Sequence, residues 1–234
     1  IRFYRTRQTL RRAARILAVS TATRRDLQSL FGLPPDKVQV VYNALDSHLQ
    51  KPAAENEIAK VLQRYSIHNP YVLYAGSARP HKNLPRLIEA FALVKDELRG
   101  HTTYKNLKLI IIGDEIGEHP ELRHAVVKCR RQNDVRFLGF VPVETLRVFY
   151  QSAEVFVFPS LYEGFGLPVL EAMSHSLPVV TSNTSALPEV GGDAALYVNP
   201  QDPEEIARKT LEVIENKTIL ENLVSRGRAR AREF

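Results

Sequence analysis

Short runs of β-branched and aromatic residues alternate with segments of helical period along most of the chain. Such alternation is typical of a parallel sheet covered by helices, because parallel strands need crossover connections. The expected strands are 16–19, 38–42, 71–74, 107–112, 135–137, 155–158, 178–181 and 196–198. The expected helices are 23–30, 55–65, 85–98, 120–131, 144–151, 168–174 and 203–215. The pattern predicts an α/β fold with a parallel sheet flanked by helices.

The chain is expected to divide into two unequal parts. Residues 1–46 supply only two strands, which make no core alone, so we interpret them as the end piece of a first Rossmann-like domain. Residues 47–69 are polar at their start, carry Pro52 and predict a linker with a connecting helix. Residues 70–234 suffice for one Rossmann-like domain. We interpret both ends as cut, because the sequence stops inside an arginine-rich helical run without a stop signal.

The net charge of +6 is gathered at the start of the chain, where eight arginines precede the first acid, Asp26. Nucleic acid is not expected as a partner, because the aromatic and glycine spacing of RNA-binding modules is missing. Two interpretations remain for the arginines: a solvated helix face, which we favour, or a contact with an anionic membrane surface or phosphate-bearing lipid. No apolar run approaches the roughly 20 residues of a membrane span. The single cysteine, Cys129, has no internal disulfide partner. These features predict a cytoplasmic protein, with peripheral contact at the inner face of the membrane as the open alternative.

The most informative window runs from Glu163 to Glu171, directly after an apolar strand. Gly164 and Gly166 let backbone amides face outward, and Pro168 presets a first helical turn, so these amides favour an anion. Carboxylates beside an anion are unfavourable unless they accept hydrogen bonds from hydroxyl groups. An anion flanked by hydroxyls describes a nucleoside diphosphate sugar. The alternative is that both acids are solvated and the glycines only shape a turn.

A basic cluster follows the expected strand 71–74. Gly76 permits close backbone approach, Arg79 offers a planar fork, and Lys82 offers a point charge to phosphate oxygens. These cations would neutralise a diphosphate and stabilise it as it departs. The alternative is a pair of surface cations in an ordinary loop.

These residues resemble the donor domain of glycosyltransferase family 4, a large retaining family of the GT-B fold, which pairs two Rossmann-like domains. The window from Glu163 to Glu171 matches the family's Glu-x7-Glu motif. The likeness runs through segments 18–20, 40–43, 76–83, 109–113, 137–142, 163–171, 187–190 and 199–206. By this resemblance, residues 70–234 form the C-terminal half of a GT-B fold.

The resemblance also implies roles for single residues. Arg79 and Lys82 would hold the donor diphosphate, Glu163 would lie at the donor sugar, and Glu171 would bind ribose hydroxyls. Arg79, Lys82 and Glu163 are the expected catalytic residues. The backbone of Val141 would meet the nucleobase edge, and further donor contacts are expected from Gly76, Gly113, Asp114, Gly164, Phe165, Gly166 and Leu167. No metal and no cofactor other than the nucleotide-sugar co-substrate is expected.

The sequence departs from the family pattern at the junction of its two parts. Ala44 stands in Asn43-Ala44-Leu45-Asp46 where the family has a glycine. The glycine-rich loop and acceptor-side histidine of the family's first domain are not found in this sequence. A missing N-terminal domain is therefore an expected partner, and the fragment is expected to bind donor with little transfer.

The expected activity is retaining transfer of a hexose to a glycan or lipid-linked acceptor. GDP-mannose is favoured and UDP-glucose is next, because residues 185–206 resemble bacterial or archaeal mannosyltransferases. A glycoside hydrolase is disfavoured, since its two carboxylates must flank the scissile bond. A nicotinamide dehydrogenase is disfavoured, since no Gly-x-Gly-x-x-Gly follows a strand. A nucleotide-sugar epimerase and a non-catalytic nucleotide-sugar-binding module remain open.

Overall fold

A parallel sheet forms the centre of the computed structural model, which describes residues 2–114 and 116–234. Within these residues the sheet has six strands in the order β5-β4-β3-β6-β7-β8, and every neighbouring pair is parallel. The strands are β3 Tyr71–Ala75, β4 Lys108–Ile112, β5 Val135–Gly139, β6 Val155–Phe158, β7 Val179–Ser182 and β8 Ala195–Val198. The predicted fold class is thereby confirmed.

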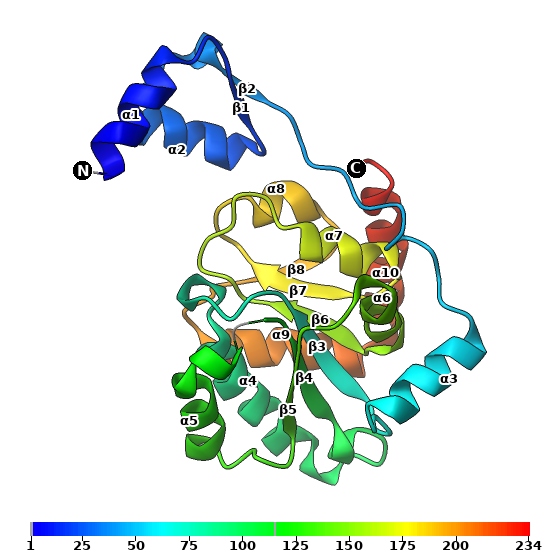
Figure 1. Ribbon diagram of the computed structural model, residues 1–234. Helices are drawn as coiled ribbons and strands as arrows, with labels where there is room; N and C mark the ends of the chain where they lie inside the picture. Colours follow the sequence, from blue (N-terminus) through cyan, green and yellow to red (C-terminus); the bar gives the residue numbers. More distant parts are fainter. Residues whose placement is uncertain (1, 115) are drawn as a thin grey trace.

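Helices cover both faces of this sheet (Figure 1). Helices α4, α5 and α9 lie on one side, and α7 and α8 lie on the other, with α10 packed against α7. Their bounds are α4 Leu84–Glu97, α5 Pro120–Lys128, α6 Val143–Ser152, α7 Leu167–Ser174, α8 Leu187–Gly191, α9 Pro203–Glu215 and α10 Lys217–Ala231. Short 3-10 turns occupy Pro35–Lys37, Pro80–Lys82, Leu98–Gly100, Tyr104–Asn106 and Ile116–Glu118.

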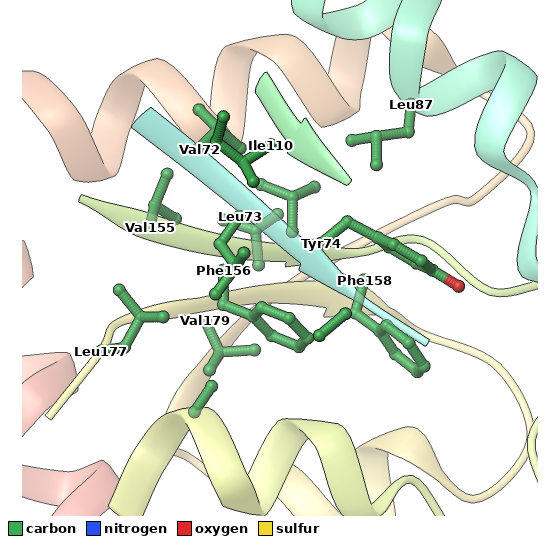
Figure 2. Packing of buried hydrophobic residues seen from close by; sticks show 14 of the residues in the cluster. Val72, Leu73, Tyr74, Leu87, Ile110, Val155, Phe156, Phe158, Leu177 and Val179 are labelled. Atoms are coloured by element: carbon green, nitrogen blue, oxygen red, sulfur yellow. The ribbon is translucent and has the colours of Figure 1, made fainter. Parts of the chain in front are cut away.

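The core lies along the central strands, as Figure 2 shows. All residues of β3 and β6 are buried, which is the behaviour of parallel strands covered on both faces. The rings of Tyr74 and Phe158 stack with centroids 5.6 Å apart, and the Tyr74 hydroxyl donates to the Ser77 carbonyl at 2.9 Å. Core packing therefore continues to the carboxyl ends of these two strands and supports the loops that follow them.

The first part of the chain forms a separate two-stranded parallel sheet. It consists of α1 Arg2–Arg12, β1 Ile16–Ala18, α2 Thr21–Phe31 and β2 Val38–Val40. The chain then runs past α10 to α3, Glu55–Arg64, before entering the larger sheet (Figure 1). Within the described part of the chain, no helix is long and apolar enough to cross a membrane.

Each predicted strand is present, but several predicted ends are wrong by one or two residues. The strand predicted to end at residue 137 continues to Gly139, whose carbonyl accepts from the Gly113 amide at 3.0 Å. The strand predicted to end at residue 42 stops at Val40. The helix predicted over 120–131 ends at Lys128, and Arg130 adopts a φ of 54° that ends the helical path. Helix α8 was not predicted, because five residues are too short to show a helical period.

Candidate functional site

The two predicted clusters lie at the point where the order of the sheet reverses. From β3 the chain proceeds outward through β4 to β5, and then returns to form β6 on the other side of β3. Open α/β sheets bind ligands at the carboxyl ends of the strands at such a switch point. The basic cluster follows β3 and the acidic window follows β6, so the topology brings both to one crevice edge.

Lys82 and Glu163 form an ion pair across this edge. Lys82 Nζ lies 2.6 Å from Glu163 Oε1, and the two side chains are only 13% and 11% exposed. The same Nζ lies 5.1 Å from the centroid of the Phe158 ring, at the end of β6. A cation and a carboxylate predicted in separate loops therefore share one partly buried position.

Asn83, next to Lys82, connects its own loop to the loops that carry Pro159 and Pro200. Its side-chain amide donates to the carbonyls of Pro159, at 2.9 Å, and Pro200, at 2.6 Å. Its backbone is left-handed, with φ of 63°, so that α4 can begin directly after the turn that carries Lys82. Sequence reasoning missed this role, although an asparagine directly before a helix is a signal for special backbone geometry. Arg79 begins the same turn and is exposed, and its carbonyl accepts from the Lys82 amide at 2.8 Å.

Glycines let the strand ends meet backbone to backbone. The Gly76 amide donates to the Ile112 carbonyl at 2.9 Å, and a Cβ at Gly113 would lie 1.9 Å from the Gly76 carbonyl oxygen. No larger residue fits at Gly113 without movement of this backbone. Asp114 follows on the exposed side, and within the described residues its side chain makes no hydrogen bond or ion pair with Lys82 or Glu163.

Helix α7 begins without a side-chain cap. Gly166 precedes it with φ of 115°, and within the part of the chain described no side chain hydrogen-bonds to the cap position. Pro168 has no N–H, and the Val169 amide donates to the Gly166 carbonyl at 3.0 Å, so the Leu167 amide is the donor of this first turn that an anion can use. The Phe165 side chain is buried in a ring cluster with Tyr42 and Phe234, at centroid distances of 5.9 and 5.7 Å, so its backbone is the part offered to a ligand.

Glu171 lies one turn into α7 and is held from α6. The Tyr150 hydroxyl donates to its Oε2 at 2.8 Å. Burial raises the pKa of Glu171, the Tyr150 hydrogen bond opposes this effect, and the charge of Asp46 adds to it. The Tyr150 ring stacks on His175 with centroids 5.9 Å apart. Tyr150 was not predicted as a site residue, because no sequence pattern near Tyr150 indicates that its side chain contacts α7.

Val141 lies just beyond β5 and is buried, whereas its neighbour Phe140 is strongly exposed.

Gly164 lies beside the first part of the chain, where its carbonyl accepts from the hydroxyls of Ser20, at 2.7 Å, and Thr23, at 3.0 Å. Among the residues that the structure describes, no group of three or more histidine, cysteine, aspartate or glutamate side chains could hold a metal ion.

Comparison with known protein families identifies the family of this chain. The family model described as "Glycosyl transferases group 1" matches residues 59–230, and the one described as "Glycosyltransferase Family 4" matches residues 1–49. The chain belongs to the group 1 glycosyl transferases. The family match covers the whole switch-point edge, from Gly76 to Glu171, so the site lies in the part of the chain that defines the family.

The curated proteins that are similar to this chain in sequence include bacterial mannosyltransferases. The chain is 38% identical to O-antigen chain mannosyltransferase B of Escherichia coli over 97% of its own length and 58% of that protein. It is 29% identical to O-antigen chain mannosyltransferase RfbU of Salmonella typhimurium, over 84% of the chain and 50% of the relative. The chain therefore spans about half the length of these relatives.

Solved structures share the fold at lower sequence identity. Anabaena HepE, solved in complex with UDP and glucose, superposes with a TM-score of 0.86 at 22% identity, over 99% of this chain and 62% of HepE. Sucrose-phosphate synthase of Thermosynechococcus elongatus gives 0.82 at 23% identity, over 99% of this chain and 57% of that protein. These likenesses agree with the predicted C-terminal half of a GT-B fold.

Proposed function

We propose that this chain is the donor-binding part of a retaining glycosyltransferase that moves a hexose from a nucleoside diphosphate sugar to a glycan or lipid-linked acceptor. The observation that carries the proposal is the 2.6 Å contact between Lys82 and Glu163 at the switch point of the sheet. A cation suited to a diphosphate there adjoins a carboxylate suited to sugar hydroxyls. Residues 70–234 would be the donor domain, and residues 1–46 part of an N-terminal domain whose remainder completes the enzyme.

The donor diphosphate would lie between Arg79, Lys82 and the backbone amides of Gly166 and Leu167 at the start of α7. As the bond to the sugar breaks, negative charge grows on the departing diphosphate, and these groups would stabilise it. The acceptor hydroxyl would approach on the face that the diphosphate leaves, so the anomeric configuration is retained. Glu163 would orient the sugar, and Glu171 would accept hydrogen bonds from the ribose hydroxyls. Gly113, Asp114 and Val141 would border the base and ribose, and Gly76 would permit close backbone approach of the donor. The transfer needs no metal.

Mannose is the favoured sugar, with GDP-mannose as donor, because the relatives named above include two mannosyltransferases of bacterial O-antigen chains. UDP-glucose is the second candidate, since HepE was solved with UDP and glucose. The enzyme would act in polysaccharide biosynthesis in the cytoplasm, and the exposed arginines of α1 would provide peripheral contact with the inner face of the membrane.

The proposal is tested by calorimetry of GDP and UDP binding to the chain and its variants. We expect Lys82→Met to weaken the binding of the preferred nucleotide about 10- to 100-fold, since a hydrogen bond to a charged group contributes about 1.5–3 kcal/mol. Glu171→Ala should weaken it by removing the ribose contact. Lys128→Met is the matched control, because this lysine is exposed on α5.

Undiminished nucleotide binding in both site variants would contradict the assignment. Thermal shifts with GDP-mannose, UDP-glucose and ADP-glucose then identify the donor. Formation of an epimerised nucleotide sugar by the full-length protein, without an acceptor, would indicate an epimerase instead. Binding without turnover by that protein would indicate a nucleotide-sugar-binding module.

A further inference from the structure

A polar cavity of about 370 Å³ lies between the first part of the chain and the larger domain. It lies between α2 and the loops after β6 and β7, and it is lined by Arg25, Asp26, Leu161, Tyr162, Thr184 and Ser185. Its volume falls in the range of roughly 300–1,000 Å³ that is usual for small-molecule sites. None of the roles proposed above uses these side chains.

The cavity is joined to the proposed site through the backbone of Glu163. The Glu163 amide donates to Ser185 Oγ at 2.9 Å, and Tyr162 directly precedes Glu163 in the chain. A ligand in the cavity would therefore lie beside the residue that orients the donor sugar. The Lys82 side chain meets Glu163 from the turn before α4, whereas the cavity is bounded by α2 and the loop that carries Thr184.

The polar groups of the cavity both donate and accept. The Tyr162 hydroxyl donates to Asp26 Oδ2 at 2.5 Å, and burial raises the pKa of Tyr162 to about 12, so this hydroxyl keeps its proton. Within the described residues, neither Asp26 Oδ1 nor the Arg25 guanidinium has a hydrogen-bond or ion-pair partner. A ligand in the cavity could therefore donate a hydrogen bond to Asp26 Oδ1 and accept hydrogen bonds from the N–H groups of Arg25.

A sugar is the ligand that this combination fits. Each sugar hydroxyl donates one hydrogen bond and accepts others, so it needs donors and acceptors close together. Tyr162 is 47% exposed, and its ring, with Leu161, offers an apolar wall to the C–H face of a pyranose. A lone anion would meet Arg25 favourably but would be repelled by the Asp26 carboxylate.

The walls of the cavity come from both the first part of the chain, which holds α1, β1, α2 and β2, and the larger domain that contains the six-stranded sheet. Arg25 and Asp26 belong to α2, while the other lining side chains named above belong to the larger domain. The two walls are held together where Ser20 and Thr23 donate to the Gly164 carbonyl. A cavity that exists only where these two parts of the chain meet suits the second substrate of a transferase, because that substrate must lie beside the bound donor.

We propose that this cavity binds the terminal sugar of the glycan acceptor, with Arg25, Asp26 and Tyr162 recognising its hydroxyls. The proposal rests on the proposed function and adds an acceptor subsite to it. Part of the acceptor specificity then resides in this chain, and only the remainder in the rest of the N-terminal domain.

The test measures binding of octyl α-mannopyranoside to the full-length protein by NMR titration. We expect Arg25→Ala and Tyr162→Phe each to raise its dissociation constant about tenfold, the effect of one lost hydrogen bond in a recognition site. Arg24→Ala is the matched control, because Arg24 is the neighbouring arginine on α2 and does not line the cavity. Calorimetry with GDP and UDP on the same variants should show unchanged nucleotide binding, which also verifies that they fold.

Failure of the wild-type protein to bind the mannoside, or equal affinity in wild type, Arg25→Ala and Tyr162→Phe, would overturn the acceptor subsite. Intact nucleotide binding in that experiment would leave the proposed function standing. Absence of GDP and UDP binding by the wild-type protein would overturn the proposed function itself, so the two failures are distinguishable.

Discussion

Glu171 is a partly buried carboxylate whose surroundings disfavour its charge. Burial raises its pKa above the ordinary value of 4.5, and the hydrogen bond from Tyr150 only partly opposes this. The native state therefore holds the proton more tightly than the unfolded chain, so stability falls as the pH rises through and above 4.5. Such a cost is expected at a site that needs the carboxylate for a ligand.

Replacing Glu171 by glutamine should stabilise the protein at neutral pH. Glutamine keeps the shape and still accepts from Tyr150, but it carries no charge to desolvate. We expect the melting temperature of Glu171→Gln to exceed that of the wild type near pH 7, and the difference to shrink towards about pH 4. Thermal melts across this range provide the measurement, and a difference that does not vary with pH would contradict the account.

At the scale of elements, the site depends on strand ends that approach one another without side chains. The Gly113 amide donates to Gly139 and the Gly76 amide donates to Ile112, so the loops after β3, β4 and β5 share one hydrogen-bonded edge. A Cβ at Gly113 would meet the Gly76 carbonyl oxygen, a backbone atom that cannot rotate away. The turn that carries Arg79 and Lys82 starts only three residues after Gly76.

Gly113→Ala should therefore lower stability by about 1–3 kcal/mol, the usual cost of overpacking a close contact. It should also weaken nucleotide binding, because Gly76 must shift. Gly100→Ala is the control, since a Cβ at Gly100 meets nothing within 4 Å. Urea unfolding of both variants measures the difference, and equal stability would show that the strand ends accommodate a methyl group.

At the scale of the whole molecule, Glu189 of α8 connects the first part of the chain to the larger domain through hydrogen bonds. Its carboxylate accepts from the amides of Thr21, at 2.8 Å, and Ala22, at 3.2 Å, and from the Tyr42 hydroxyl at 2.8 Å. Burial would raise the pKa of Glu189, but the hydrogen bonds from Thr21, Tyr42 and Ala22 outweigh burial and lower it. The carboxylate thus caps the N-terminus of α2 from another element.

Glu189→Ala should loosen this contact without unfolding the large sheet. We expect faster hydrogen exchange at the amides of Thr21 and Ala22, corresponding to a loss of about 1–3 kcal/mol for donors left without an acceptor. Asp193→Ala is the control, because Asp193 lies just after α8 and its side chain is 80% exposed. In the wild type the contact should weaken as the pH falls below 4.5, since the depressed pKa makes the charged form the stabilising one. Unchanged exchange in Glu189→Ala would contradict the role.

Local features of the sequence predicted the strands and most of the helices, but not α8. The strands Tyr71–Ala75 and Val155–Phe158 appear as apolar runs because both faces of a parallel strand are buried. The start of α7 is marked by Gly166 and Pro168, whose backbone preferences act within one turn. Element ends were less accurate, because pairs such as Gly113 with Gly139 set them through contacts between strands.

The amino-acid sequence by itself determined the α/β fold, the order of the strands along the chain and the chemistry available to each loop. Only the tertiary structure decided that Lys82 meets Glu163, that Tyr150 holds Glu171, that Asn83 joins three loops and that Glu189 caps α2. Hydrophobic periodicity reports which face of an element is buried, but not which element covers it. Residues 81 positions apart meet here because β6 returns to lie beside β3, and that choice depends on the packing of the entire sheet.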